Sequence, residues 1–490
     1  MPLNNEQKYA YDIMASGQNV FLTGNAGTGK SYVIRKFIDD HKDSTIVCAP
    51  TGIAAYLIGG TTLHRIFNIP SAPCPFAGNK HNRLLDTAKT LIIDEISMVR
   101  RDVFDYVIKI IRNTEKKNGK SIQIIVCGDF AQLPPVLTQS VKPVLEKQYG
   151  ADAGYCYAFQ SHFWNELGFH NIRLTKIVRQ EDADAAAVLN RVRLGDYSAV
   201  RDVFSAVLHN PFNRDSITIV ATNSMAERIN DEEIKKIDAP AKDFYMTVDG
   251  NVRNDEIICA EQMTLKPGCR VMLLANLGPT VVNGMTGTVK TIFSDPFTGA
   301  DVVHVQWDNG ETTIVSPYKW TVYDYISTDD GKIEQVEVGA YTQLPLKPAY
   351  AVTIHKSQGQ TYEAANLVAD AVFAPGQMYV ALSRVKHFER LYVAPGIKIH
   401  RLADPLVVRW YDELQYDDFP APEKTNSPSQ TVQTQPITPE QKTQKNRNRR
   451  GRKSTWRGEP TTIIRVPVRI ADRLMLEAHR MIDEEVPQTI

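Results

Sequence analysis

Residues 24–31 form a pattern that can bind the phosphates of a nucleotide. They read Gly24, Asn25, Ala26, Gly27, Thr28, Gly29, Lys30 and Ser31, a full match to G-x-x-x-x-G-K-[ST]. An apolar run at residues 20–22 precedes the match and a helix is expected over residues 30–39, so the loop would join a strand to a helix. Backbone N–H groups would surround the phosphates, Lys30 would reach the β- and γ-phosphates, and the Ser31 hydroxyl would hold Mg²⁺. The pattern predicts binding of a nucleoside triphosphate.

Polar side chains follow two further apolar runs. Asp94 and Glu95 come directly after residues 91–93, and Gln132 lies before the rigid pair Pro134 and Pro135. Hydrolysis of a nucleotide needs one carboxylate for Mg²⁺ and one that activates water, so we assign Asp94 to the metal and Glu95 to the base. Gln132 could sense the γ-phosphate or position water. A solvated turn is the ordinary explanation of each feature alone, and the phosphate loop upstream favours catalysis.

The elements that must position these residues alternate between β-rich and helical patterns. Short apolar runs occur at residues 45–49, 90–93, 122–127, 217–221 and 366–369, with helix-like segments between them. This alternation predicts an α/β fold with parallel sheets. Residues 264–347 differ, because closely spaced short strands with Gly and Asp-Asn-Gly turns predict a small β-barrel inserted in the second α/β unit. Prolines and glycine at residues 70–83 predict a loop or small insertion.

Length and composition restrict the class of protein. The 490 residues are enough for about two to four domains, and 43% apolar with 23% charged residues is ordinary for a globular protein. The sequence has no apolar run long enough to span a membrane, and residues 1–6 do not resemble a targeting segment. The six cysteines show no C-x-x-C spacing, which favours reduced thiols in a reducing cytosol over disulfides or zinc.

The C-terminal region differs in composition from the rest. From about residue 419 the chain is rich in Pro, Gln, Thr and Ser, which predicts a disordered linker, and residues 441–457 carry eight basic residues and no acidic one. The basic run could bind phosphates or act as a nuclear localisation signal. Residues 458–490 predict a short strand and a helix that resemble a ribbon-helix-helix fragment, which would pair with a protein partner or a second copy. A tail without a partner is the alternative.

Seven further segments occur in an order that resembles one family. They are residues 3–7 (the adenine-reading Q motif), 49–55 (motif Ia), 62–64 (Ib), 94–98 (II), 174–179 (IV), 349–361 (V) and 379–384 (VI). Over about residues 1–415 the chain resembles a superfamily 1 DNA helicase of the 5′→3′ branch, PIF-type or RecD-like. The resemblance implies two RecA-like domains with an SH3-like β-barrel inserted in the second, and a flexible C-terminal tail.

The resemblance also implies domain limits. RecA-like domain 1 would cover residues 1–173, with a short wedge-like insertion at about 68–84 whose loop at 73–76 is a candidate strand separator. Domain 2 would begin at 174–263 and continue at 348–418, with the barrel at 264–347 between the two parts. A linker at 419–457 and the strand-helix tail at 458–490 would follow.

Site residues follow from the same resemblance. Gln7 would read adenine, Gly359 would contact the nucleotide, and Arg179 and Arg384 would reach across the cleft to the γ-phosphate as catalytic arginines. The expected cofactors are ATP and Mg²⁺, and the expected partners are single-stranded and duplex or forked DNA, with no membrane. The residues implied to line a single-strand channel are Thr51, His64, Thr353, His355 and Ser357, where His64 or His355 could stack on a base.

Several alternatives stay open at this point. An AAA-type remodeller would share the phosphate loop but lack the second RecA-like domain, and a DNA-tethering protein would have lost its ATPase. The absence of an N-K-x-D motif disfavours a GTPase switch. Residues 102–122 lack the signature that PIF-type enzymes usually carry there, so the resemblance is to PIF-like or RecD-like enzymes. Direction, pathway and oligomeric state are not set by the residues, and the expected location is cytoplasmic, with a nuclear location also open.

Overall fold

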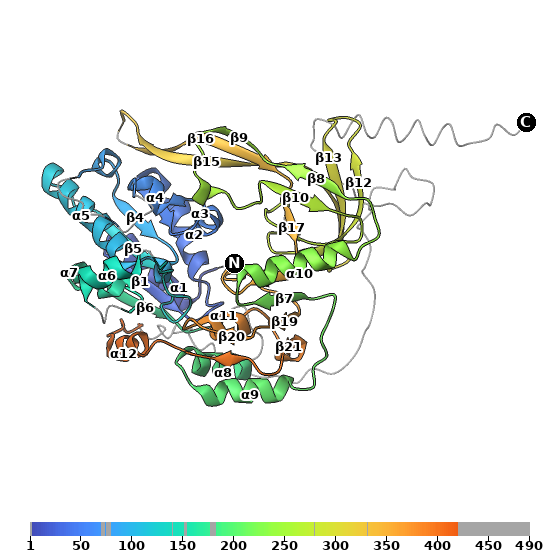
Figure 1. Ribbon diagram of the computed structural model, residues 1–490. Helices are drawn as coiled ribbons and strands as arrows, with labels where there is room; N and C mark the ends of the chain where they lie inside the picture. Colours follow the sequence, from blue (N-terminus) through green and yellow to red (C-terminus); the bar gives the residue numbers. More distant parts are fainter. Residues whose placement is uncertain are drawn as a thin grey trace, which may run out of the picture. The chain divides into compact units, whose positions relative to one another are not determined.

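The computed structural model describes residues 2–69, 74, 80–139, 141–150, 154–176, 183–278, 280–330 and 332–419 (Figure 1). These residues belong to one unit, Met1–Glu423. Arg179, most of the proposed wedge loop and the whole tail after residue 419 lie outside the described residues. Within the described part of the chain, no helix has the length and apolar character needed to cross a membrane.

The N-terminal domain contains a six-stranded sheet whose paired strands are all parallel. Its strand order is β3-β2-β4-β5-β1-β6. The strands are β1 (Val20–Gly24), β2 (Thr45–Ala49), β3 (Thr61–Thr62), β4 (Thr90–Ile93), β5 (Gln123–Cys127) and β6 (His170–Leu174). The apolar runs predicted at residues 45–49, 90–93 and 122–127 are therefore confirmed as strands. Because the sheet is buried on both faces, its strands read as continuous apolar runs.

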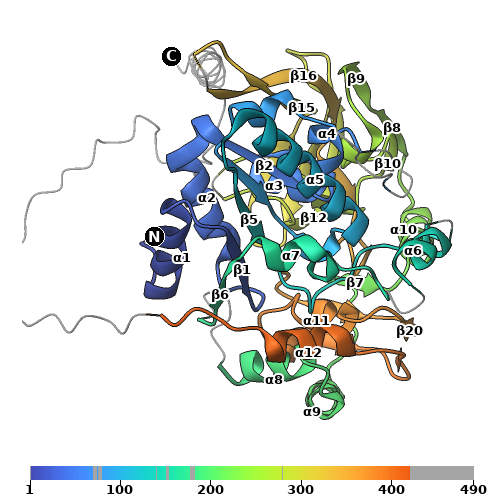
Figure 2. The ribbon, with the colours of Figure 1, turned by 90° about the vertical axis from the view of Figure 1, so that its left-hand side faces the viewer.

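Helices cover both faces of this sheet. Alternate strand residues enter two cores: Val20 and Leu22 pack in the core that includes α1 and α2, whereas Phe21 packs in the core that includes α5 and α7. Figure 2 shows these two pairs of helices on opposite sides of the strands. The helices of this domain are α1 (Asn5–Ala15), α2 (Lys30–His41), α3 (Gly52–Ile58), α4 (Leu63–Ile66), α5 (Arg101–Asn118), α6 (Lys142–Tyr149) and α7 (His162–Glu166).

A second parallel sheet lies later in the chain, with strand order β18-β7-β19-β21. It consists of β7 (Ile217–Val220), β18 (Ala351–Thr353), β19 (Ala365–Leu367) and β21 (Leu391–Val393). Its helices are α8 (Ala183–Arg193), α9 (Tyr197–Val207), α10 (Asn223–Lys235) and α11 (Gln377–Leu382), and two short strands lie nearby, β20 (Ala371–Val372) and β22 (Lys398–Ile399). Figure 1 shows α10 on one side of this sheet and α8 and α9 on the other. Two parallel-sheet domains confirm the predicted fold class.

Antiparallel strands occupy most of the chain between α10 and β18. They form a five-stranded sheet of order β14-β13-β12-β11-β17, a three-stranded sheet of order β15-β16-β9, and the pair β10-β8. The strands are β8 (Lys242–Tyr245), β9 (Thr247–Gly250), β10 (Gln262–Leu265), β11 (Arg270–Leu273), β12 (Thr286–Ser294), β13 (Asp301–Trp307), β14 (Thr312–Val315), β15 (Tyr318–Ser327), β16 (Ile333–Gln343) and β17 (Leu346–Pro348). The inserted β-region is thus present. Its likeness to an SH3 barrel and the exact domain limits stay predictions.

Two segments return to the N-terminal domain. The hairpin β15–β16 reaches β2, where the hydroxyl of Tyr325 accepts a hydrogen bond from the backbone N–H of Val47 at 3.3 Å. Helix α12 (Pro405–Glu413) places Val407 and Tyr411 in the core on the α5 side of the first sheet. These contacts join regions that lie about 280 to 390 residues apart in the sequence.

Candidate active site

The predicted phosphate loop joins β1 to α2 at the carboxyl end of the first sheet. The Nζ of Lys30 donates hydrogen bonds to the backbone carbonyls of Gly24 at 2.8 Å and Asn25 at 3.1 Å. The Thr28 hydroxyl donates to the carbonyl of Asn25 at 2.9 Å. Gly29 adopts φ +85°, and a Cβ there would lie 2.5 Å from the side-chain nitrogen of Gln7. The left-handed backbone conformation therefore favours glycine at this position, and a Cβ would also displace the side chain of Gln7.

Gln7 lies against this loop, and its contact with adenine stays a prediction. It is buried, and its Nε2 donates to the carbonyl of Thr28 at 3.2 Å. A capping box with Asn4 fixes the start of α1 and so the position of Gln7. The neighbouring Glu6 accepts backbone hydrogen bonds from Thr175 at 2.8 Å and from Lys176 at 3.1 Å. Helix α1 therefore holds both the loop and the start of the segment that contains Arg179.

Asp94 and Glu95 follow β4 beside the loop. Asp94 is only 8% exposed, and burial raises its pKa. Glu95 is half-buried, and desolvation by the surrounding protein, together with the charge of Asp94, raises its pKa to about 7. Glu95 also has φ +50° and ψ +46°, a left-handed conformation that a non-glycine residue adopts at an energetic cost and that is concentrated at functional sites. A carboxyl group with a pKa near 7 is suited to accept a proton at neutral pH.

The second domain contributes an amide that sequence reasoning did not single out. The Nε2 of Gln358 donates to a carboxylate oxygen of Glu95 at 3.2 Å and to the side-chain oxygen of Gln132 at 3.3 Å. Three residues from different segments thus meet in one cluster. The signal in the sequence was that Gln358 lies inside residues 349–361, which resemble motif V, between the two selected residues Ser357 and Gly359.

Both ends of residues 379–384, which resemble motif VI, lie in the same region. The first residue is Tyr379 and the last is Arg384. The hydroxyl of Tyr379 accepts a hydrogen bond from the backbone N–H of Ala26, in the phosphate loop, at 2.9 Å. Arg384 is 1% exposed, and its Nη1 donates to the carbonyls of Ser357 at 3.0 Å and Gln360 at 2.8 Å. Its charge also lowers the pKa of Glu95, against the larger effect of desolvation. Arg384 therefore acts electrostatically on Glu95 from the second domain.

A buried ion pair lies behind Gln132. Asp129 is fully buried and pairs with Arg193 of α8, with Nη2 2.7 Å from the carboxylate. The hydroxyl of Tyr411 from α12 donates to the same carboxylate at 3.1 Å. Burial alone would raise the pKa of Asp129, but the charge and hydrogen bonds of Arg193 outweigh it and lower that pKa. This cluster joins the first domain, the second domain and the C-terminal helix.

The residues implied to contact DNA divide into two groups. Thr51, at the start of α3, accepts a backbone hydrogen bond from Ala54 at 3.3 Å, and His64 lies on α4. The second group consists of Thr353, His355 and Ser357, at every second position from the last residue of β18. Burial lowers the pKa of both His64 and His355, so each imidazole favours its neutral form.

The hydroxyls of the second group are engaged within their own turn. Thr353 accepts a backbone hydrogen bond from Lys356 at 3.2 Å, and the fully buried Ser357 donates to the carbonyl of Ile354 at 2.8 Å. In this arrangement the two hydroxyls stabilise the turn. Of the three side chains, His355 is the most exposed. Gly359 is exposed with φ +79° beside Gln358. Its contact with nucleotide stays a prediction.

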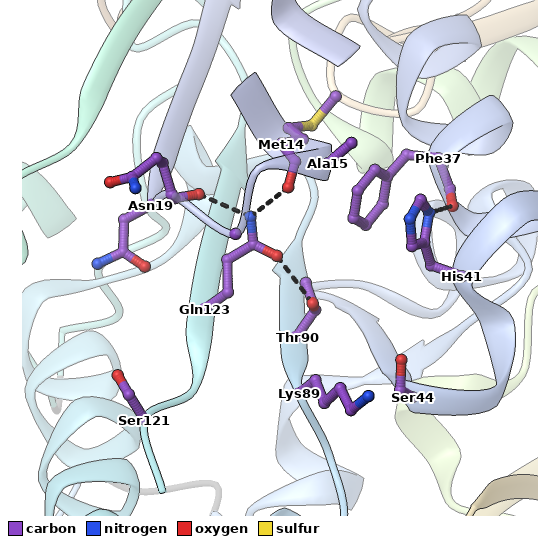
Figure 3. A pocket seen from close by; sticks show the side chains of 12 residues that line it. Met14, Ala15, Asn19, Phe37, His41, Ser44, Lys89, Thr90, Ser121 and Gln123 are labelled. Carbon is purple, nitrogen blue, oxygen red and sulfur yellow. Dashed lines mark hydrogen bonds between the residues drawn. The ribbon is translucent and has the colours of Figure 1, made fainter. Parts of the chain in front are cut away.

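A cavity of about 580 Å³ lies at the other end of the first sheet (Figure 3). It is lined by residues at the starts of β4 and β5, including Lys89, Thr90 and Gln123, and by Asn19 just before β1. Gln123 uses its amide internally, because Nε2 donates to the carbonyl of Met14 at 2.7 Å and Oε1 accepts from Thr90 at 2.8 Å. Ligands of open parallel sheets bind at the carboxyl ends of the strands, so this cavity is not part of the nucleotide site.

Comparisons with known proteins agree with this geometry. The sequence model of the family described as PIF1-like helicase matches residues 2–200. The human ATP-dependent DNA helicase PIF1 is 32% identical over 84% of this chain, and the chain spans 64% of that relative's length. The ATP-dependent DNA helicase Pif1 of Bdellovibrio bacteriovorus is 32% identical over 84% of this chain and 92% of the relative.

Solved structures of Pif1 from Bacteroides show the same fold. The complex with ADP-AlF4 is 31% identical, covers 84% of this chain and 97% of the other, and has a TM-score of 0.73. The complex with ADP-AlF3 and single-stranded DNA is 32% identical over the same shares, with a TM-score of 0.59. The departure at residues 102–122 therefore does not separate the chain from PIF-type proteins. The chain belongs to the PIF1-like helicase family.

Proposed function

We propose that this chain is an ATP-dependent DNA helicase that moves along single-stranded DNA and hydrolyses ATP between its two RecA-like domains. The observation that carries the proposal is the cluster of Glu95, Gln132 and Gln358, in which the second domain contacts the proposed catalytic base of the first. The relatives from human and Bdellovibrio bear that name, and the Bacteroides structures hold a nucleotide analogue, one of them with single-stranded DNA. An AAA-type remodeller lacks the second parallel-sheet domain.

The chemistry follows from the residues at the cleft. Lys30 neutralises the β- and γ-phosphates, and Glu95 accepts the proton of the attacking water while Gln132 orients that water. Arg384 stabilises charge that develops on the γ-phosphate, and Arg179 remains the second candidate. The Ser31 hydroxyl and the buried Asp94 carboxylate suit Mg²⁺, which takes few protein ligands beside the phosphates of its substrate. Bound Mg²⁺ supplies further neutralisation of phosphate charge.

Movement along DNA requires contacts with the DNA that change with the state of the bound nucleotide. Thr51 and His64 lie on the first domain and His355 on the second, so closure of the cleft changes the distance between the two groups. Backbone amides and hydroxyls would hold phosphates, and His64 or His355 would stack on a base. Movement is 5′→3′ and the substrates include forked duplexes, in keeping with the family. We place the enzyme in the cytoplasm, with the DNA of a bacterial or phage nucleoid, and a nuclear location stays open.

Loss of the phosphate-loop lysine tests this proposal. We expect Lys30→Ala to abolish ATP hydrolysis with and without single-stranded DNA, because the phosphates lose their principal side-chain cation. Lys36→Ala is the matched control, since Lys36 lies on the same helix and pairs with the exposed Asp40. Unwinding of duplexes with 5′ or 3′ overhangs then measures direction. Full DNA-stimulated hydrolysis by Lys30→Ala would contradict the assignment.

A further inference from the structure

Two lysines lie close together where the inserted β-region meets the second parallel-sheet domain. Lys347 is the middle residue of β17, and Lys356 lies in the turn after β18, which consists of residues 354–360. Lys347 lies outside every motif, and Lys356 separates His355 from Ser357. The charge of Lys356 acts on the amine of Lys347, so two separate elements bring positive charge to one place.

The pairing of β17 with β11 shows on which face of the sheet the side chain of Lys347 lies. Val271, Leu273 and Leu346 pack in the core of the inserted β-region, whereas Met272 packs in the core of the second domain. Lys347 is directly opposite Met272 in the antiparallel register, so both side chains lie on the same face of the sheet. The side chain of Lys347 therefore lies on the face that is turned toward the second domain.

The inserted β-region also packs closely against the turn after β18. Gly284, in the loop between β11 and β12, has φ +90°, and a Cβ there would lie 1.9 Å from the Oε1 of Gln360. The left-handed backbone favours glycine at this position, and the missing side chain permits the close approach. The turn that contains Lys356 is therefore held against the same region that contains Lys347.

The charge of Lys347 has no opposite charge to balance it among the described residues. The one described ionisable group that acts on its amine is Lys356, which repels it. Desolvation, together with this repulsion, lowers the pKa of Lys347 to about 8. By contrast, Lys319 on β15 of the same region pairs with Glu337 at 2.7 Å. A desolvated ammonium group without a counter-ion is costly, so an anion between the two lysines would be stabilised.

The surroundings of the two lysines indicate which anion this is. The cations with the largest effect on Glu95 in the nucleotide cleft are Lys30 and Arg384, so the triphosphate has cations of its own. Lys356 instead lies between two residues that the resemblance places along the path of single-stranded DNA. The hydroxyl of one of them, Ser357, is already used within the turn. The phosphates of DNA are therefore the anions that fit this position.

We propose that Lys347 and Lys356 form a binding site for one backbone phosphate of single-stranded DNA. The inserted β-region supplies one ammonium group and the second domain supplies the other, and the phosphodiester lies between them. The contact is electrostatic and does not depend on the base, which suits a protein that moves along any sequence. The inference rests on the proposed helicase function and adds to it a DNA contact made by the inserted β-region.

Lys347→Met tests this site, because methionine keeps an unbranched apolar side chain and removes the charge. We expect the slope of log K against log[salt] for single-stranded DNA to flatten by about 0.7, the value for one phosphate contact. At about 0.1 M salt this change corresponds to an affinity about fivefold weaker. The loss should be the same for oligothymidine and for mixed sequences, because the phosphate is common to both. Fluorescence anisotropy of a labelled oligonucleotide at several salt concentrations measures affinity and slope.

Further variants keep the test interpretable. Lys347→Arg keeps the positive charge and should keep most of the salt slope. Lys356 is exposed, so Lys356→Met should show the same loss as Lys347→Met without a change in a core. Lys319→Met removes a lysine of the same region that already has an acidic partner, and it should match the wild type. KM for ATP measured without DNA should stay within about twofold in all variants, which separates DNA phosphates from nucleotide phosphates.

The outcomes separate the two proposals. If the wild type does not bind single-stranded DNA, the proposed helicase function fails and this inference fails with it. If the wild type binds DNA but Lys347→Met and Lys356→Met keep its affinity and its salt slope, only the inference is overturned. A weaker affinity with an unchanged slope also overturns it, because that result indicates altered packing and no lost phosphate contact. A higher KM for ATP without DNA overturns it as well, since the lysines would then serve the nucleotide.

Discussion

Two acidic residues follow neighbouring strands of the same sheet, and their pKa values shift in opposite directions. Glu95 lies two residues after β4 and Asp129 two residues after β5. Asp129 meets Arg193 and Tyr411, which lower its pKa against the effect of burial. Glu95 accepts a hydrogen bond from the neutral amide of Gln358, and desolvation with the charge of Asp94 raises its pKa to about 7. Position on the sheet does not distinguish a base from a structural carboxylate; the partner supplied by distant parts of the chain does.

The largest expected effect is on catalysis at Glu95. Glu95→Gln removes the proton acceptor and should lower kcat for ATP by about 10²- to 10⁴-fold, the usual contribution of a general base. Binding of an ATP analogue should persist, because Lys30 and the loop are unchanged. Single-turnover hydrolysis with saturating single-stranded DNA measures the loss. A kcat within threefold of the wild type would show that Glu95 is not the base and would remove the contrast with Asp129.

For the free energy of unfolding, we expect the large effect at Asp129 and not at Glu95. Arg193→Met leaves Asp129 fully buried without its cation, which should destabilise the folded protein by about 3–5 kcal/mol. Urea unfolding followed by far-UV circular dichroism measures the change. Arg193→Met combined with Asp129→Asn should recover much of the loss, because the double variant leaves no unpaired charge. Equal destabilisation by the single and double variants would indicate that packing, not charge, is the cause.

Much of the fold and part of the site could be predicted because they depend on local patterns. The phosphate loop needs its glycines and Lys30 in consecutive positions, so one short segment predicts it. The strands of the two parallel sheets appear as apolar runs because both faces of each sheet are covered. The order of the motifs supplied the pairing of two domains, which no single segment indicates.

The remaining contacts join residues that are distant in the sequence. Tyr411 meets Asp129 from 282 residues away, and Gln358 meets Glu95 from 263 residues away. Spacing along the chain carries no signal for such pairs, and each side chain has an ordinary explanation on a surface. The hairpin β15–β16 was predicted as strands of a barrel, but its contact with β2 through Tyr325 depends on tertiary packing alone.

A smaller effect is expected at the C-terminal helix. The hydroxyl of Tyr411 donates to Asp129 and accepts the backbone N–H of Phe130 at 2.9 Å, so Tyr411→Phe leaves that N–H unsatisfied in a buried site. The free energy of unfolding should fall by about 1–3 kcal/mol. Tyr416→Phe, on the half-buried segment after α12, is the matched control and should change it by less than about 0.5 kcal/mol. A loss at Tyr411 no larger than at Tyr416 would remove Tyr411 from the cluster.

The smallest and most specific effect is on the pH dependence of stability. The pKa of Glu95 is about 7 in the folded protein against an ordinary value of 4.5, so between these values the folded state binds more protons than the unfolded state. Stability from this group is therefore greatest below about pH 4.5 and falls as the pH rises toward 7, with a slope of at most about 1.4 kcal/mol per pH unit. Asp129 has the opposite sign, since its lowered pKa gives stability that is lost only in stronger acid. Between about pH 5 and about pH 8 the wild type should therefore lose more stability, or gain less, than Glu95→Gln, because the other groups that titrate contribute equally to both proteins. Identical pH dependence in the two proteins would mean that Glu95 ionises as an ordinary carboxyl, and the two strand ends would then differ in geometry but not in charge.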